Sequence, residues 1–213
     1  LTVSATAVGI PFNMDMPKLT DVLPNGPTWI IIVLVLGALT TWIAAKGYNM
    51  VSQAANWMSP IIILGFLAAG IVAIGQLEIK SFSDFWNIWG EGREPFPGQI
   101  KYTFWHVAIW SWFANAAMHV GMSDLSVFRY AKSAKSGWTT AAGMYVGHYM
   151  AWIAAALLYA VYLKSPEALG LLSSGQAPTV APGPLAYNAI GVFGVIVVIL
   201  AGWTTANPTI YRA

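Results

Sequence analysis

Two stretches of this chain place hydrogen-bonding groups inside otherwise apolar runs, and the first is AGWTTANPTIYRA at 201–213. On a helix, Thr204 and Thr205 follow Ala201 by three and four residues, so their hydroxyls can approach its carbonyl. Neutral oxygens of this kind are ligands for a small hard cation such as Na⁺. Pro208 removes the donor for the carbonyl four residues earlier. The alternative is that both threonines hydrogen-bond to the preceding turn and that the proline ends the helix.

The second stretch is YTFWHVAIWSWFANAAMHVGM at 102–122, which is uncharged and heavily aromatic. Trp112, Asn115 and His119 lie at i, i+3 and i+7, on one stripe of a helix. An indole face beside an amide can stack on a flat ring and hydrogen-bond to its edge. The first stretch also contains an amide, at Asn207 beside Pro208. The alternative is helix packing, in which the amides and the indole join neighbouring helices and the histidine caps an end.

Composition places both stretches in a membrane protein. Of the 213 residues, 57% are hydrophobic and only 8% are charged, with a mean hydropathy of +0.62. A soluble domain carries about 25% charged residues. The absence of cysteine excludes disulfides and thiolate sites, and a net charge of +2 without strong clustering does not indicate nucleic acid. Because the sequence also shows no phosphate-binding glycine loop, metal-spaced histidine cluster or catalytic triad, we predict an all-α integral membrane protein that is not an enzyme.

Five apolar runs approach the length of about 20 residues that a membrane helix needs. They form a single membrane domain, 1–213, with predicted spans over residues 29–45, 56–77, 102–122, 137–163 and 185–206. An odd number of spans, running out without a tail, predicts an internal piece of a longer protein. We expect further helices before Leu1 and after Ala213.

The distribution of basic residues predicts the two sides of the membrane. Lys and Arg are concentrated in the short connections 46–55 and 123–136, close to helix ends, which places that side in the cytoplasm. Residues 1–28 and the loops 78–101 and 164–184 then lie outside. We predict a multi-pass protein of the cell (plasma or inner) membrane, with the lipid bilayer as a partner.

Three stretches of the chain resemble the nucleobase–cation symporters, the family of cytosine, uracil, allantoin and hydantoin permeases. AAKGYNMVSQAANWMSPIIIL is similar to that family's turn between the fourth and fifth helices and its proline-bearing fifth helix. WFANAAMHVGMSDLSVFRYAKS resembles the sixth helix and the turn after it. WTTANPTIYRA resembles the eighth helix, where members show Trp, paired Ser/Thr and an Asn-rich continuation. The resemblance covers nearly the whole chain, as helices four to eight of about twelve in a leucine-transporter-type fold, which has inverted repeats and a broken helix at mid-membrane.

The resemblance also implies roles for particular residues. It assigns contact with a nucleobase-like substrate to two aromatic rings and two amides: Trp112, Phe113, Asn115 and Asn207. It assigns half of a sodium site to one turn of the eighth helix: Ala201, Thr204 and Thr205. The other half would lie on the first helix, outside this chain.

The function that the resemblance implies is import of a purine, pyrimidine, hydantoin, allantoin or similar flat heterocycle by alternating access. The coupling ion is Na⁺ or H⁺, and no other cofactor is expected. The paired threonines favour Na⁺, whereas three histidines in predicted spans keep H⁺ open. Two alternatives stand beside it: a transporter of the same fold for another small solute such as an amino acid, and a non-transporting membrane scaffold or sensor.

Overall fold

Helices form every regular element that the structure, a computed structural model, describes; the described ranges are residues 2–17, 21, 26–89, 103–115 and 130–212. Three of these helices, α2 (Pro27–Ala45), α3 (Tyr48–Gln76) and α7 (Lys135–Tyr162), are each long and apolar enough to cross a membrane. The remaining helices are α1 (Thr2–Gly9), η1 (Ile10–Phe12), α4 (Phe82–Trp89), α5 (Phe104–Asn115), α8 (Pro166–Ser173), α9 (Pro182–Ile190) and α10 (Val192–Arg212). The predicted all-α class and its membrane-length helices are therefore confirmed, whereas the count of five spans stays a prediction.

Two of the predicted spans, 29–45 and 137–163, match α2 and α7 to within two residues at each end. The third, 56–77, ends one residue after α3, and α3 begins eight residues earlier than predicted. The predicted connection 46–55 is thus wrong for most of its length. Only Lys46 and Gly47 separate the two helices. The chain turns at Gly47, which adopts a positive φ of 88°. Helix α3 can begin directly after it because no strong helix breaker follows until Pro60, and α3 contains Pro60 within the helix.

The predicted span 185–206 is wrong as one continuous helix. It divides at Gly191, whose φ of 63° and ψ of −147° belong to a region that only glycine occupies readily. The second part, α10, then continues through Pro208 to Arg212. The prediction over 102–122 is met by α5 as far as Asn115, and the rest of that stretch lies outside the described residues.

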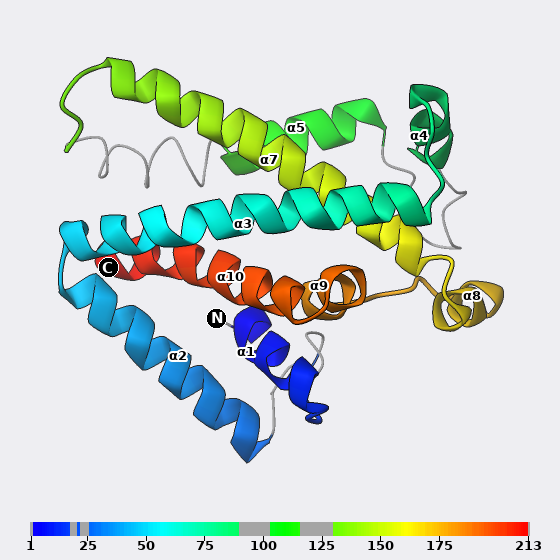
Figure 1. Cartoon of the computed structure of the whole chain (residues 1–213), viewed down its shortest axis with the longest axis horizontal. Coiled ribbons are helices and arrows are strands. Elements are labelled where there is room, and N and C mark those ends of the chain that lie inside the picture. Colours follow the sequence, from blue (N-terminus) through cyan, green and yellow to red (C-terminus); the bar gives the residue numbers. More distant parts are fainter. Residues whose placement is uncertain (1, 18–20, 22–25, 90–102, 116–129, 213) are drawn as a thin grey trace.

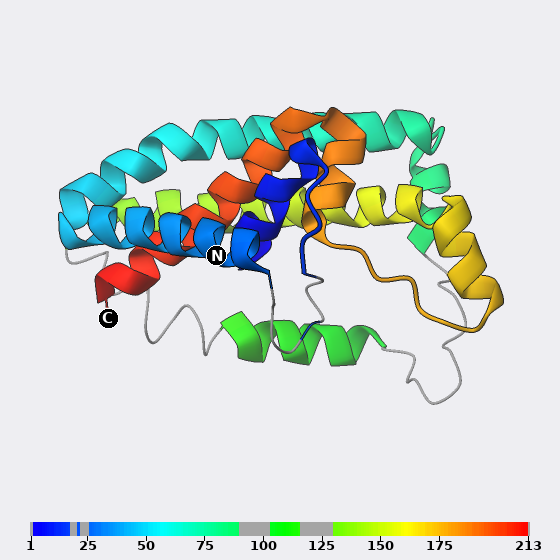
Figure 2. The ribbon, with the colours of Figure 1, turned by 90° about the horizontal axis from the view of Figure 1, so that it is seen from below.

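Helices α3 and α10 form the centre of the bundle (Figures 1 and 2). Helix α3 packs along α7 on one side and along α10 on the other, and α10 also contacts α1, α2 and α9. The α3–α7 contact is built around a buried cluster of alanine and leucine side chains: Ala69, Ala73, Leu77, Leu157, Leu158 and Ala160. Small residues let two helices approach closely, which is the main source of helix association where lipid surrounds the protein.

The opening residues form part of this bundle instead of a simple external segment. Helix α1 buries Ser4, Ala5, Ala7 and Gly9, and it packs against α10, α2 and α9. Short side chains at these positions make close packing sterically feasible. The sequence analysis placed residues 1–28 outside the membrane and did not predict this contact. A stretch of eight small and apolar residues is too short to be recognised as a span.

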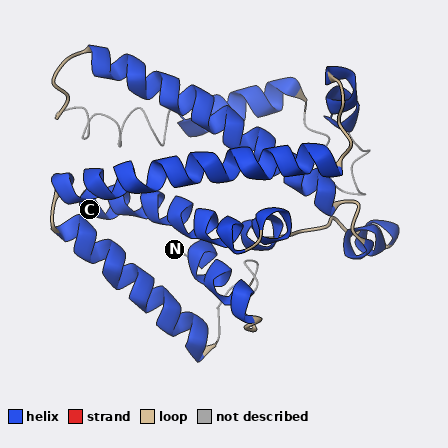
Figure 3. Ribbon diagram, in the orientation of Figure 1, coloured by secondary structure: helices blue, strands red, loops and turns tan. Residues whose placement is uncertain are grey.

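Two short helices lie in the loops predicted to be external, and Figure 3 shows both at one end of the bundle. At the start of α4, the Asp84 carboxylate accepts hydrogen bonds from the backbone N–H groups of Lys80 and Ser81. Together with the Ser81 hydroxyl, these donors hold the pKa of Asp84 below its usual value. At the start of α8, the Ser165 hydroxyl accepts a hydrogen bond from the N–H of Ala168.

Two tyrosines one turn apart on α7, Tyr159 and Tyr162, should differ in how removal of the hydroxyl changes the free energy of unfolding. The Tyr159 hydroxyl donates to the carbonyl of Pro178 at 2.8 Å, whereas the buried Tyr162 hydroxyl has no hydrogen-bond partner within the described ranges. Tyr159→Phe should therefore cost about 1 kcal/mol of unfolding free energy, while Tyr162→Phe should be neutral or stabilising. Reversible unfolding in mixed micelles, followed by circular dichroism, measures both. Equal losses would contradict the distinction between the two hydroxyls.

Candidate functional site

One turn of α10 brings three of the predicted cation ligands together. The Thr204 and Thr205 hydroxyls each donate a hydrogen bond to the carbonyl oxygen of Ala201, and both distances are 3.0 Å. Thr204 is half-buried and Thr205 is exposed. Pro208 lies within the helix and cannot donate to the Thr204 carbonyl, four residues earlier. The turn therefore holds two hydroxyl oxygens in contact with one carbonyl oxygen, and the Thr204 carbonyl lacks its usual backbone donor.

This geometry bears on both interpretations of the threonines. Hydrogen bonding to the preceding turn, the alternative to a cation site, is present. The accompanying expectation that proline ends the helix is wrong, because α10 continues for four more residues. Hydroxyl rotation could still redirect the oxygen lone pairs toward an ion, since a hydroxyl is both donor and acceptor.

Asn207 lies one turn further along α10 and is only 2% exposed. Its side-chain oxygen accepts a hydrogen bond of 3.2 Å from the indole N–H of Trp203. Because an indole can only donate, this bond determines that the oxygen end of the amide faces Trp203 and that the NH₂ end faces away from it. Trp203 is a hydrogen-bond partner of Asn207 that the sequence analysis did not predict, although the two residues are four apart and therefore lie on one face of a helix.

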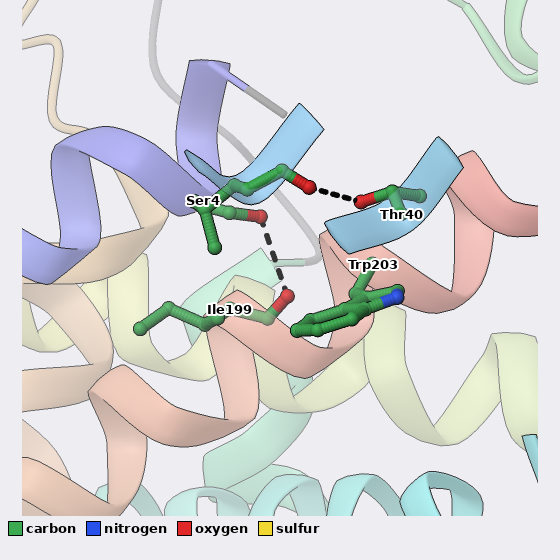
Figure 4. Close-up of a pocket in the computed structure, with 5 residues that line it drawn as sticks. Ser4, Thr40, Ile199 and Trp203 are labelled. Carbon is green, nitrogen blue, oxygen red and sulfur yellow. Dashed lines mark hydrogen bonds between the residues drawn. The ribbon is translucent and has the colours of Figure 1, made fainter. Parts of the chain in front are cut away.

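Helix α1 approaches α10 just before this turn. The Ser4 hydroxyl donates to the Ile199 carbonyl at 3.3 Å, and a Cβ atom placed on Gly202 would lie 2.1 Å from the Ser4 Oγ. Nearby, the Thr40 hydroxyl of α2 donates to the carbonyl of Leu36 within its own helix. Figure 4 shows Ser4, Thr40, Ile199 and Trp203 around a narrow gap between the three helices, which is too small to hold a water molecule.

The predicted aromatic half of the substrate site lies elsewhere. Trp112 is 72% exposed and Phe113 is also exposed, and both belong to α5. Figure 2 shows α5 apart from α10 and from the other helices that pack around it. Asn115 is the last described residue of α5, and its side chain lies outside the described part. The structure thus gathers Ala201, Thr204, Thr205 and Asn207 on α10, and it does not bring Trp112 or Phe113 to them.

A wider cleft of about 730 Å³ lies away from these residues, between η1, α8 and the start of α9. Its lining includes the carboxylates of Asp15 and Glu167 and the side chains of Met14 and Met16. No predicted site residue lines it. Within the described ranges, no group of three His, Asp or Glu side chains is placed to hold a metal ion.

Comparisons with protein families, curated proteins and solved structures find no match to this chain. The structure itself defines the class of protein: an all-helical chain whose described part contains three helices long and apolar enough to cross a membrane.

Proposed function

We propose that this chain is part of a secondary active transporter for a nucleobase or a related flat heterocycle, coupled to Na⁺ or H⁺. The observation that supports it most is the turn of α10 in which the hydroxyls of Thr204 and Thr205 meet the carbonyl of Ala201. Uncharged oxygens at a helix irregularity are the usual ligands for Na⁺ in transporters. A proline inside an apolar helix supplies that irregularity here.

The buried amide next to this turn supports the substrate half of the proposal. A polar side chain in an apolar helix is costly unless it is paired, and Trp203 pairs with only one end of Asn207. The NH₂ end can donate to a ring nitrogen or carbonyl, the acceptors that every nucleobase carries. Cation and substrate would then bind within two turns of one helix.

Proximity of the two ligands provides a mechanism of coupling. A cation that draws the Thr204 and Thr205 oxygens toward itself orders the turn that carries Asn207, so each ligand raises the affinity of the other by the same factor. Movement of the helices around the occupied site would expose it to the opposite side. The paired threonines favour Na⁺ over H⁺ as the coupling ion.

The second candidate, a membrane scaffold without transport, is supported by a different feature of the same turn. Both threonine hydroxyls already have a partner inside α10, and Asn207 is held by Trp203. In a scaffold these bonds would serve packing alone, and no ligand would alter them.

The test is a titration of the purified protein in detergent with uracil, cytosine, hypoxanthine, allantoin and a hydantoin, with and without Na⁺, read by tryptophan fluorescence. Saturable quenching that Na⁺ tightens is the expected result. Thr205→Ala should abolish the effect of Na⁺, and Asn207→Ala should weaken substrate binding at least about tenfold, because each removes a direct ligand. Thr41→Ala, at an exposed threonine of α2, is the matched control and should behave like the parent.

Other outcomes of this titration are equally decisive. Quenching that depends on pH and not on Na⁺ would assign coupling to protons. A folded protein that responds to none of the rings would overturn the nucleobase proposal and favour the scaffold. Equal losses in Thr41→Ala and Thr205→Ala would show that the turn of α10 has no special role.

A further inference from the structure

Three tyrosines from distant parts of the chain meet at one end of the bundle. The rings of Tyr48, at the start of α3, and Tyr130, before α7, stack with centroids 4.2 Å apart. The Tyr130 and Tyr211 hydroxyls are joined by a hydrogen bond of 2.8 Å, and Tyr211 lies in the last turn of α10. Tyr48 and Tyr211 are also in ring contact, at 6.5 Å. These contacts hold the α2–α3 turn, the start of α7 and the end of α10 together as one surface.

Each of these three segments carries basic residues. Lys46 precedes Tyr48 by two residues, Lys132 and Lys135 follow Tyr130, and Arg212 follows Tyr211. The three lysines are exposed. The acidic residues within the described ranges lie in other segments: Asp15, Asp21, Glu78, Asp84 and Glu167. The tyrosine contacts therefore assemble a positive surface that contains no described carboxylate.

This positive surface lies at the end of the bundle where a membrane-spanning arrangement of the long helices would place it beside lipid headgroups. The three described helices that are long and apolar enough to cross a membrane, α2, α3 and α7, all have an end here, while α4 and α8 lie at the opposite end (Figure 1). Trp138, in the first turn of α7, is 82% exposed at this end, and tryptophan is enriched where a protein meets the lipid headgroups. The Lys46 ammonium lies 5.7 Å from the centre of the Trp42 ring, as a lysine does when it extends from an apolar helix toward lipid headgroups.

We infer that this end of the bundle, defined by Tyr48, Tyr130, Tyr211, Lys46, Lys132 and Lys135, binds anionic phospholipid headgroups. The lysines supply the charge that recognises a phosphodiester, and the contacts among the tyrosines hold together the segments that carry these lysines. A neutral phospholipid carries the same phosphate but balances it with a cationic group, so it should bind more weakly. The inference is independent of the proposed transport function, since it rests only on membrane insertion and on the charges at one end.

The test measures apparent Kd values for phosphatidylglycerol and phosphatidylcholine with the same acyl chains, by native mass spectrometry of the protein released from detergent micelles. The parent should bind phosphatidylglycerol more tightly. The triple variant Lys46→Gln/Lys132→Gln/Lys135→Gln should lose about fivefold in affinity per lysine, which matches the usual strength of a basic residue near an anionic membrane surface. The matched control is Lys80→Gln/Lys164→Gln, with both changes at the opposite end of the bundle, and it should keep the preference of the parent.

A second experiment uses only the parent protein, so its result does not depend on whether the triple variant folds. Raising NaCl to about 0.5 M should reduce the preference of the parent for phosphatidylglycerol, because salt screens exposed charges. Soluble glycerol phosphate at the same concentration should not compete, since a lipid is also held by its acyl chains. A preference that survives in the folded triple variant, that is lost in the control, or that is insensitive to salt would overturn the inference.

Discussion

Replacing Gly194 with alanine should lower the free energy of unfolding by about 3 kcal/mol. Gly194 lies in the first turn of α10, and a Cβ atom there would be 2.2 Å from the Ala186 carbonyl oxygen of α9 and 2.5 Å from its carbon. These are backbone atoms, so no rotamer change can relieve the collision. The two helices would have to separate around Gly191, where the chain turns with a φ of 63°.

The matched control is Gly37→Ala, because a Cβ on Gly37, in the middle of α2, would meet nothing within 4 Å. That change should be neutral or stabilising by about 0.5–1 kcal/mol, since alanine is the better helix former. Reversible unfolding in mixed micelles, followed by circular dichroism, measures both variants. If Gly194→Ala is as stable as Gly37→Ala, then α9 and α10 do not meet at this angle.

The second large effect is expected where α3 crosses α10. A Cβ atom on Gly65 would lie 2.1 Å from Cγ2 and 2.9 Å from Cγ1 of Val197, a side chain that is almost fully buried. A valine has little freedom at χ1, so it cannot turn both methyl groups away. Gly65→Ala should therefore cost about 2–3 kcal/mol of unfolding free energy by overpacking.

A second substitution distinguishes this collision from a general loss of helix packing. Val197→Ala removes both colliding methyl groups and leaves only the Val197 Cβ position, at 3.1 Å. The double variant Gly65→Ala/Val197→Ala should be more stable than the sum of the two single losses predicts, with a coupling energy of at least about 1 kcal/mol in the same unfolding assay. Strictly additive losses would show that the two residues do not touch.

The sequence by itself determined that the chain forms membrane-length helices, and it determined the contacts within single helical turns. Too few charges and too many apolar residues for a soluble domain predicted membrane-length helices, and α2 and α7 begin and end close to the predicted positions. The contact of Thr204 and Thr205 with the Ala201 carbonyl was equally predictable. All three groups lie within one helical turn, and their distances follow from helix geometry alone.

What only the tertiary structure decided depends on residues far apart in the chain. The insertion of α1 beside α10 and the meeting of Tyr48, Tyr130 and Tyr211 have no local signature. Trp112 and Phe113 carry the residue types of a ring-binding surface, yet α5 does not bring them to Asn207. The physical reason is that spacing determines which side chains share a face of one helix, whereas the pairing of faces depends on where glycines such as Gly65 and Gly202 let two backbones approach.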